Sequence, residues 1–128
     1  MSVKKNNSIC LDTNIIISLG KHDDPQLLEK VITRQVNTSV LAKIEALGYR
    51  YLSDPEKRAL TRLLAAMVVL PLTEEVVSGA ITLRQQKNIR TPDAIIAATA
   101  MAHNLELWTH NIKDFRHISG LKLFDPLA

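Results

Sequence analysis

The sequence predicts a three-layer α/β/α fold built on a central, mainly parallel β-sheet. Short apolar runs bounded by polar residues, which are typical of buried strands, recur along the chain, and segments with helical apolar spacing separate them. Strands that alternate with helices in this way pair in parallel through right-handed crossovers and bury both faces of the sheet. We expect a single domain over residues 1–128, whose residues 1–7 form a flexible tail that lacks the apolar core of a signal peptide.

The first strand is expected at residues 9–12, which read I-C-L-D and end in the carboxylate of Asp12. The apolar residues after Asn14 predict a helix packed behind this strand. Open α/β sheets place their chemistry where a strand ends and a helix begins, so Asp12 is the first candidate site residue. Cys10, inside the strand, is interpreted as a small apolar core residue.

Capping residues mark most of the later helices. Asp24 precedes Pro25 at a first helical position, and Ser39, Ser53 and Thr73 are further candidate N-caps. The expected helices cover residues 26–34, 40–47, 54–64, 74–86 and 94–102, and the expected later strands cover residues 36–38, 67–70, 105–109 and 121–124. Residues 111–115 are expected to form a turn or a single helical turn.

Apolar spacing assigns the buried faces of two of these helices. The helix at 26–34 carries Leu27, Leu28, Val31 and Ile32 on one face. The helix at 94–102 is so rich in Ala and Ile that both of its sides are expected to be buried.

Composition narrows the class of protein. No apolar run approaches the roughly 20 residues of a membrane span, so no membrane partner is expected. One cysteine excludes an internal disulfide framework, fits a reducing compartment and favours a cytoplasmic location. The four histidines, His22, His103, His110 and His117, show no metal-ligand spacing and are interpreted as surface or loop residues.

The net charge of +3 is mild support for an anionic partner, and a solvated basic surface explains it equally well. If four of the 13 acids belong to one metal pocket, the 16 basic residues stand against only nine acids elsewhere. A basic surface around an acidic pocket suits a protein that binds and cuts a phosphate backbone.

Three later acids are expected near Asp12. Asp93 lies in the first turn of the Ala-rich helix, and Asp114 follows the strand at 105–109 within a few residues. The carboxyl ends of parallel strands meet at one edge of the sheet, where these side chains would gather. Glu45 lies about a turn and a half beyond Ser39, so its helix must lean across the same edge.

Each of these acids also has an ordinary structural interpretation. Asp93 can serve only as a partner of the helix dipole, and Asp114 can be a turn residue. Glu45 can pair with Lys43 or Arg50 at a surface, although an unpaired carboxylate inside an otherwise apolar helix is costly.

Four carboxylates in one pocket repel, and burial raises their pKa values unless a cation intervenes. Oxygen-only ligands favour Mg²⁺ or Mn²⁺ over zinc, and such ions equip a site for phosphodiester hydrolysis. Hydrogen bonds from four residues would orient the carboxylates, namely Thr13, Asn14, Thr109 and Asn111. Arg84, Lys87 and Arg90 lead into Asp93 and are candidate RNA contacts, although a solvated helix end explains them as well.

Five segments resemble, in their order and spacing, PIN domains, and most closely the short VapC-type ribonuclease toxins of bacterial toxin–antitoxin pairs. They read I-C-L-D-T-N, S-V-L-A-K-I-E-A-L-G, T-P-D-A-I-I-A-A-T-A, L-W-T-H-N-I-K-D-F and L-K-L-F-D-P, and they span nearly the whole chain. The resemblance implies a catalytic quartet of Asp12, Glu45, Asp93 and Asp114, with Asp12, Asp93 and Asp114 as metal ligands. It also implies Mg²⁺-dependent endoribonuclease activity in which Mn²⁺ substitutes, an RNA substrate, a homodimer, and a cognate antitoxin whose segment enters the site.

The chain departs from the family pattern at three positions. His110 stands where the family often has arginine, Asn104 where a glycine commonly precedes the strand, and Ala46 where a larger apolar residue usually follows the glutamate. These departures bear on substrate contacts and leave all four acids in place.

Two other classes of protein remain open. A PIN-fold module that binds RNA or protein without catalysis is separated from a nuclease only by an activity assay. A phospho-receiver domain is similar in size and also doubly wound, but it needs a phosphoacceptor Asp after the third strand, where this chain has Pro71 and Leu72.

Overall fold

The computed structural model describes residues 7–21 and 24–128. The predicted tail at residues 1–7 therefore lies outside the described residues except for Asn7, and His22 lies outside them as well. In chain order the elements are β1 (Ser8–Leu11), α1 (Thr13–Gly20), α2 (Pro25–Ile32), β2 (Gln35–Ser39), α3 (Val40–Leu47), α4 (Asp54–Ala65), β3 (Val68–Leu70), α5 (Glu74–Gln86), α6 (Thr91–Ala102), β4 (Glu106–Trp108), α7 (Ile112–Phe115) and β5 (Leu123–Phe124).

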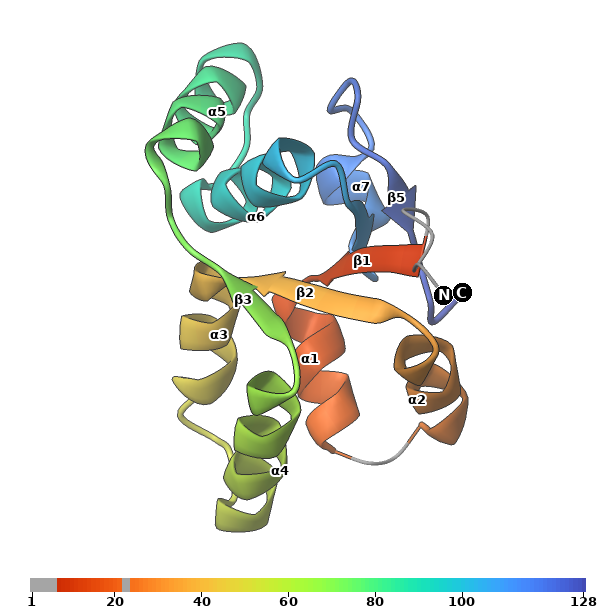
Figure 1. Ribbon diagram of the computed structural model, residues 1–128. Helices are drawn as coiled ribbons and strands as arrows, with labels where there is room; N and C mark the ends of the chain where they lie inside the picture. Colours follow the sequence, from red (N-terminus) through yellow and green to blue (C-terminus); the bar gives the residue numbers. More distant parts are fainter. Residues whose placement is uncertain (1–6, 22–23) are drawn as a thin grey trace.

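The strands form one five-stranded sheet in the order β3-β2-β1-β4-β5, and all four pairings are parallel. Helices α5, α6 and α7 cover one face, while α1, α2, α3 and α4 lie on the other (Figure 1). The prediction of a three-layer α/β/α fold with a mainly parallel sheet is confirmed. Because every strand runs the same way, the segments after β1, β2 and β4 leave the sheet at a single edge.

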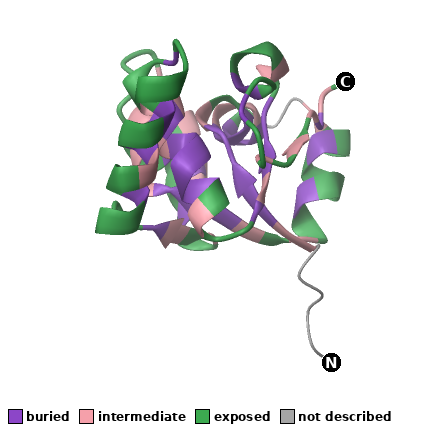
Figure 2. Cartoon of the chain, turned by 90° about the horizontal axis from the view of Figure 1, so that it is seen from above, coloured by how far each residue is buried: buried purple, intermediate pink, exposed green. Residues whose placement is uncertain are grey.

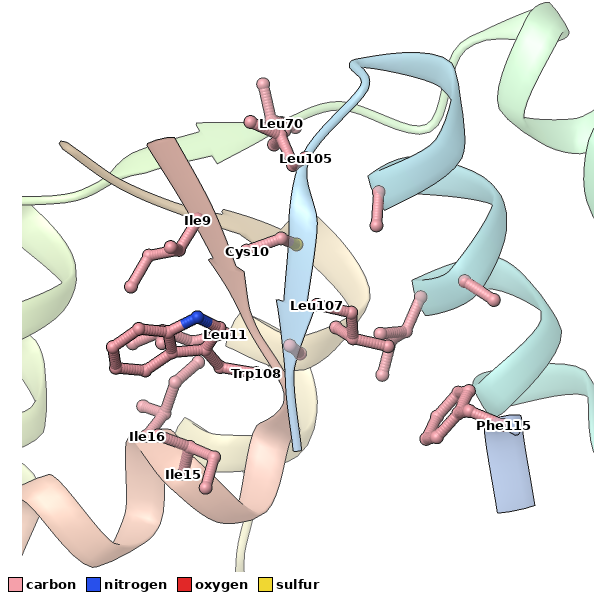
Figure 3. Packing of buried hydrophobic residues seen from close by; sticks show 14 of the residues in the cluster. Ile9, Cys10, Leu11, Ile15, Ile16, Leu70, Leu105, Leu107, Trp108 and Phe115 are labelled. Atoms are coloured by element: carbon pink, nitrogen blue, oxygen red, sulfur yellow. The ribbon is translucent and has the colours of Figure 1, made fainter. Parts of the chain in front are cut away.

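The core lies between the sheet and its two helical layers. In β1, Ile9, Cys10 and Leu11 are fully buried, as are Leu107 in β4 and Phe115 in α7. Neighbouring side chains alternate across β4, with Leu107 on the side of α6 and Trp108 on the side of α1 (Figure 3). Figure 2 shows the buried strands between helices whose outer surfaces are exposed.

Side-chain hydrogen bonds cap the N-termini of several helices, as expected. Asp24 accepts a hydrogen bond from the N–H of Leu27, and Ser53 forms a reciprocal capping box with Glu56. Helix α6 is different, because Arg90 at its N-cap makes no side-chain capping bond. It begins at Thr91, and Asp93 lies in its first turn, as predicted.

The predicted burial of α2 was partly wrong. Leu27 and Val31 are buried, whereas Leu28 is 39% and Ile32 67% exposed. The four residues form two adjacent i, i+4 rows on the helix surface, and a helix at the edge of a domain buries only the row that faces the sheet.

The burial expected for α6 is confirmed, since six of its twelve residues are buried: Ala94, Ile96, Ala97, Ala98, Thr99 and Ala100. The turn that follows contains Asn104, whose φ of 53° lies in the left-handed region. Asparagine tolerates this conformation better than most non-glycine residues, which explains how it replaces the family's glycine.

No helix among the described residues is long and apolar enough to cross a bilayer.

Candidate active site

Asp12 occupies the junction between β1 and α1 and is 5% exposed. Its Oδ1 accepts a hydrogen bond from the backbone N–H of Thr13 at 2.7 Å, and its Oδ2 accepts one from the hydroxyl of Thr109 at 2.7 Å. The backbone N–H of Asp12 donates to the carbonyl of Trp108 at 3.0 Å. The carboxylate is therefore held by the ends of two neighbouring strands.

Thr109 is fully buried just beyond β4. Its hydroxyl oxygen accepts the backbone N–H of Asn111 at 3.0 Å, which leaves the hydroxyl proton for Asp12. Asn111 thus supports this arrangement indirectly, through a backbone hydrogen bond to Thr109. Asn14 is exposed and makes no side-chain hydrogen bond within the described part of the chain, although it lines the same cavity as Asp12.

Glu45 comes to the same place from α3. Because α3 begins directly after β2, its early turns lie at the carboxyl edge of the sheet. The hydroxyl of Thr13 donates to Oε1 of Glu45 at 2.8 Å, so Thr13 connects Glu45 to Asp12. Neither Lys43 nor Arg50 forms an ion pair with Glu45 in the described structure, so the predicted alternative of a surface pair does not hold.

All four predicted acids line one cavity of about 200 Å³. Asp93 enters it half-buried from the first turn of α6, and Asp114 enters it from α7 with an exposed side chain. The remaining lining residues are Thr13, Asn14, Arg90, Pro92 and Asn111. Four segments that are far apart in the sequence thus meet at the carboxyl edge.

Two of the carboxyl groups, those of Asp12 and Asp93, have raised pKa values. Burial raises the pKa of Asp12, and the charges of Glu45 and Asp114 raise it further against the hydrogen bonds from Thr109 and Thr13. Burial also raises the pKa of Asp93, to which the charge of Asp12 adds while Arg90 opposes the shift. The four acids therefore share one field of negative charge, which Arg90 offsets only in part.

The chemistry of this cavity fits a hard divalent cation. Its candidate ligands are carboxylate oxygens, the donor type that Mg²⁺ and Mn²⁺ prefer, and a cation would relieve the raised pKa values. Among the described residues, however, no three His, Cys, Asp or Glu side chains are already arranged as a metal-binding group. Unneutralised carboxylates repel one another, which disfavours a closed set of ligands before a cation binds.

The predicted cationic residues separate into two locations. Arg84 and Arg90 line a groove that adjoins the acidic cavity, together with Lys113 and His117. Lys87 instead lines a different cavity between α5 and α6, so it does not join the predicted path. Sequence reasoning did not select Lys113, although it directly precedes Asp114 in the L-W-T-H-N-I-K-D-F segment.

Two other residues near the site have structural roles: Cys10 packs in the core, and His110 lies beside a carboxylate. Burial raises the pKa of Cys10 to about 12, so its thiol is a core group, as predicted. His110 is exposed and its Nδ1 lies 3.0 Å from a carboxylate oxygen of Asp125. His103 and His117 are exposed, as expected for surface histidines.

The PIN domain family model matches residues 9–121. Ribonuclease VapC1 of Rickettsia felis is 48% identical over 40 residues, and this match spans 31% of the present chain and 30% of that protein.

Solved structures match over far more of the chain. A toxin–antitoxin complex from Klebsiella pneumoniae matches with a TM-score of 0.77 and 28% identity, covering 92% of this chain and 97% of the other. VapBC-1 from nontypeable Haemophilus influenzae matches with a TM-score of 0.77 and 28% identity, covering 94% and 99%. VapBC2 from Rickettsia felis bound to a promoter DNA fragment has a TM-score of 0.81, 20% identity and coverage of 91% and 97%, a likeness of fold alone.

Proposed function

The chain belongs to the PIN domain family, and we propose that it is a divalent-metal-dependent endoribonuclease that acts as the toxin of a toxin–antitoxin pair. One observation carries the proposal: Asp12, Glu45, Asp93 and Asp114 come from four separate segments and line a single cavity at the carboxyl edge of the sheet. Structural carboxylates on a surface would spread apart to reduce their repulsion, so their convergence supports a role in binding a cation.

In the proposed reaction, Asp12, Asp93 and Asp114 would hold the ion. A bound Mg²⁺ or Mn²⁺ supplies Lewis acidity toward a phosphoryl oxygen and lowers the pKa of water. Thr109 and the backbone N–H of Thr13 fix the orientation of Asp12. Glu45, oriented by the hydroxyl of Thr13, would accept a proton from the water that attacks the phosphorus. The P–O bond to the leaving oxygen would break in the same step, and that oxygen would take its proton from solvent.

The toxin part of the proposal rests on the relatives. Ribonuclease VapC1 is named for RNA cleavage, and the Klebsiella structure, 28% identical to this chain, is a toxin–antitoxin complex. By analogy, we propose a cognate antitoxin whose segment enters the acidic cavity, a homodimer, and a location in the cytoplasm. The buried thiol of Cys10 is compatible with that reducing compartment.

The substitution Asp93→Asn tests the catalytic proposal. It should leave the protein folded, because Asp93 accepts no hydrogen bond from another described residue, and it should abolish RNA cleavage. EDTA should abolish RNA cleavage by the unmodified protein, and added Mg²⁺ or Mn²⁺ should restore the cleavage. Glu74→Gln is the matched control, since it removes a first-turn acid from α5 outside the site. A folded Asp93→Asn protein that still cuts RNA, or full activity in chelator, would refute the mechanism.

The second candidate is a PIN-fold module that binds RNA or protein without catalysis. It is compatible with the finding that no three described acids form a preassembled metal-binding group, which repulsion between metal-free carboxylates explains equally well. Calorimetric titration with Mg²⁺ or Mn²⁺, combined with the cleavage assay, separates the two. The phospho-receiver alternative is set aside, because β3 leads into Pro71 and Leu72 without an acceptor aspartate and the chain matches the PIN family.

A further inference from the structure

A second concave region adjoins the acidic cavity. It is a groove of about 500 Å³ between the α5–α6 connection and α7, and Figure 1 shows α7 beside α6. Arg90, Asp93 and Asp114 line both the groove and the cavity. Beyond this shared boundary the groove is lined by Arg84, Lys113 and His117, and we call it the basic groove.

The cations of the basic groove are available to a ligand. Arg84, Arg90 and Lys113 are all exposed, and none forms an ion pair with a carboxylate of a described residue. The side chain of Arg84 is held in place by a hydrogen bond, which its guanidinium donates to the hydroxyl of Thr91 at the start of α6. Arg84 and Lys113 therefore present positive charge to a ligand on the side of the groove away from the acidic cavity, while Arg90 lies in the field of Asp93.

The side chains that line the basic groove indicate which class of anionic ligand it binds. It contains no Phe, Tyr or Trp, its one aromatic ring is the imidazole of His117, and its one apolar side chain, Ile89, is buried. Protein partners usually anchor a large apolar or aromatic group in a pocket, which this groove does not offer. Exposed cations along a polar groove suit the phosphates of a nucleic acid strand.

We propose that the basic groove binds the phosphate backbone of a single RNA strand on one side of the bond that the acidic cavity cleaves. This inference rests on the proposed function, because it takes its substrate class from it. Arg84 and Lys113 contact phosphates outside the cavity, and Arg90 lies between these contacts and Asp93. Such contacts position the strand without reading its bases, so the groove contributes affinity and alignment but no sequence preference.

The test measures RNA binding separately from cleavage. The protein carries Asp12→Asn to prevent cutting, and the fluorescence anisotropy of a labelled oligouridine strand is followed over a range of monovalent salt. Lys113→Gln and Arg84→Gln should each weaken binding several-fold. Each should also reduce the slope of log affinity against log salt by about 0.7, the value for one lost phosphate contact on a single strand.

The matched controls are Lys57→Gln and Arg58→Gln on α4, which remove the same charge from exposed positions that line neither the groove nor the cavity. They should leave the slope unchanged. Circular dichroism verifies folding, and Lys113→Gln is the decisive variant, since the Lys113 side chain makes no hydrogen bond to a described residue. Equal affinity and slope for the groove variants and the controls would overturn the proposal.

Further outcomes distinguish the basic groove from the proposed function. If the unmodified protein cuts no RNA but Lys113→Gln still weakens RNA binding, the proposed nuclease activity is refuted and RNA binding by the basic groove is supported. If cleavage requires a metal ion while the groove variants bind RNA normally, only the proposal that the basic groove binds RNA is refuted. Oligoglutamate serves as a probe for an acidic protein segment, and selective loss of its binding in Lys113→Gln would assign the groove to a protein partner and refute the RNA proposal.

Discussion

Asp12 shows how burial and hydrogen bonding compete at a single residue. Both of its oxygens accept short hydrogen bonds, which favour the charged form, yet its pKa is raised because desolvation and neighbouring acids outweigh them. A carboxylate in this position is destabilising to the protein by itself. Its presence is understandable if a cation neutralises it.

The first residue-scale prediction concerns pH and stability. Because the pKa of Asp12 is higher in the folded than in the unfolded protein, the folded state binds more protons above the ordinary value of 3.8. Without metal, the free energy of unfolding should therefore fall as the pH rises from about 4 toward the raised pKa. Asp12→Asn should reduce this dependence, leaving the part that comes from the raised pKa of Asp93, and should stabilise the metal-free protein at neutral pH by on the order of 1 kcal/mol.

Urea unfolding in EDTA at several pH values measures this effect. Glu29→Gln on α2 is the control, because it removes an exposed acid outside the site. A decrease in stability of Asp12→Asn at neutral pH, relative to the unmodified protein, would contradict the prediction.

The second residue-scale prediction concerns Thr109. Thr109→Val keeps the shape of a fully buried side chain but removes the hydroxyl that donates to Asp12. The loss should cost about 1–3 kcal/mol of stability and weaken Mg²⁺ binding about 10- to 100-fold. Thr99→Val is the comparison, since the Thr99 hydroxyl is also buried but donates only to the Ile95 carbonyl of its own helix. Equal Mg²⁺ affinity in the two variants, measured by calorimetry, would argue against a supporting role for Thr109.

At the scale of elements, the contact between α5 and α6 determines where the groove and the cavity lie relative to each other. These helices approach closely at Gly79, where an added Cβ would lie 3.3 Å from the Cβ of Ala98. Small residues at this crossing allow the approach. Arg84 in the last turn of α5 and Arg90 in the α5–α6 connection then line the groove beside Asp93.

We expect Gly79→Val to force α5 away from α6. The branched side chain cannot fit between the helices, and overpacking of this kind costs about 1–3 kcal/mol. Ser78→Val at the neighbouring exposed position should change stability by no more than about 0.5 kcal/mol. Thermal denaturation followed by circular dichroism compares the two variants, and similar melting temperatures would show that the crossing has room for a larger residue.

At the scale of the whole molecule, the parallel sheet is what gathers the acids. Residues 12, 45, 93 and 114 are distant in the sequence, but β1, β2 and β4 are neighbours in the sheet and end at the same edge. The carboxylates concentrate negative charge there, while the protein as a whole is basic. This distribution suits an anionic polymer that approaches a cation-filled cavity.

Mg²⁺ should therefore stabilise the folded protein as a whole. A ligand that binds only the folded state adds about 2.7 kcal/mol at a concentration one hundred times its dissociation constant. The melting temperature of the unmodified protein should rise with added Mg²⁺ and fall in EDTA, and that of Asp12→Asn should respond much less. The same response in both proteins would place the ion outside the acidic cavity.

Local patterns in the sequence were sufficient for the order of strands and helices, the parallel sheet, and the choice of the four acids. Strand runs, helical spacing and capping residues act over a few positions, so they can be read without knowing the fold. They did not show which side chains of an element face the core. The rotation of α2 about its axis buries Leu27 but exposes Leu28. Lys87 follows the end of α5 in extended backbone and lines a different cavity from the groove that Arg84 lines.

The tertiary structure alone decided how the site is connected. The hydroxyl of Thr13 reaches Glu45, Thr109 holds Asp12, and Lys113 joins Arg84 in a second groove. These contacts join residues that are between 29 and 97 positions apart in the sequence. Their geometry depends on how strands and helices pack against one another, which no pattern within a single segment contains.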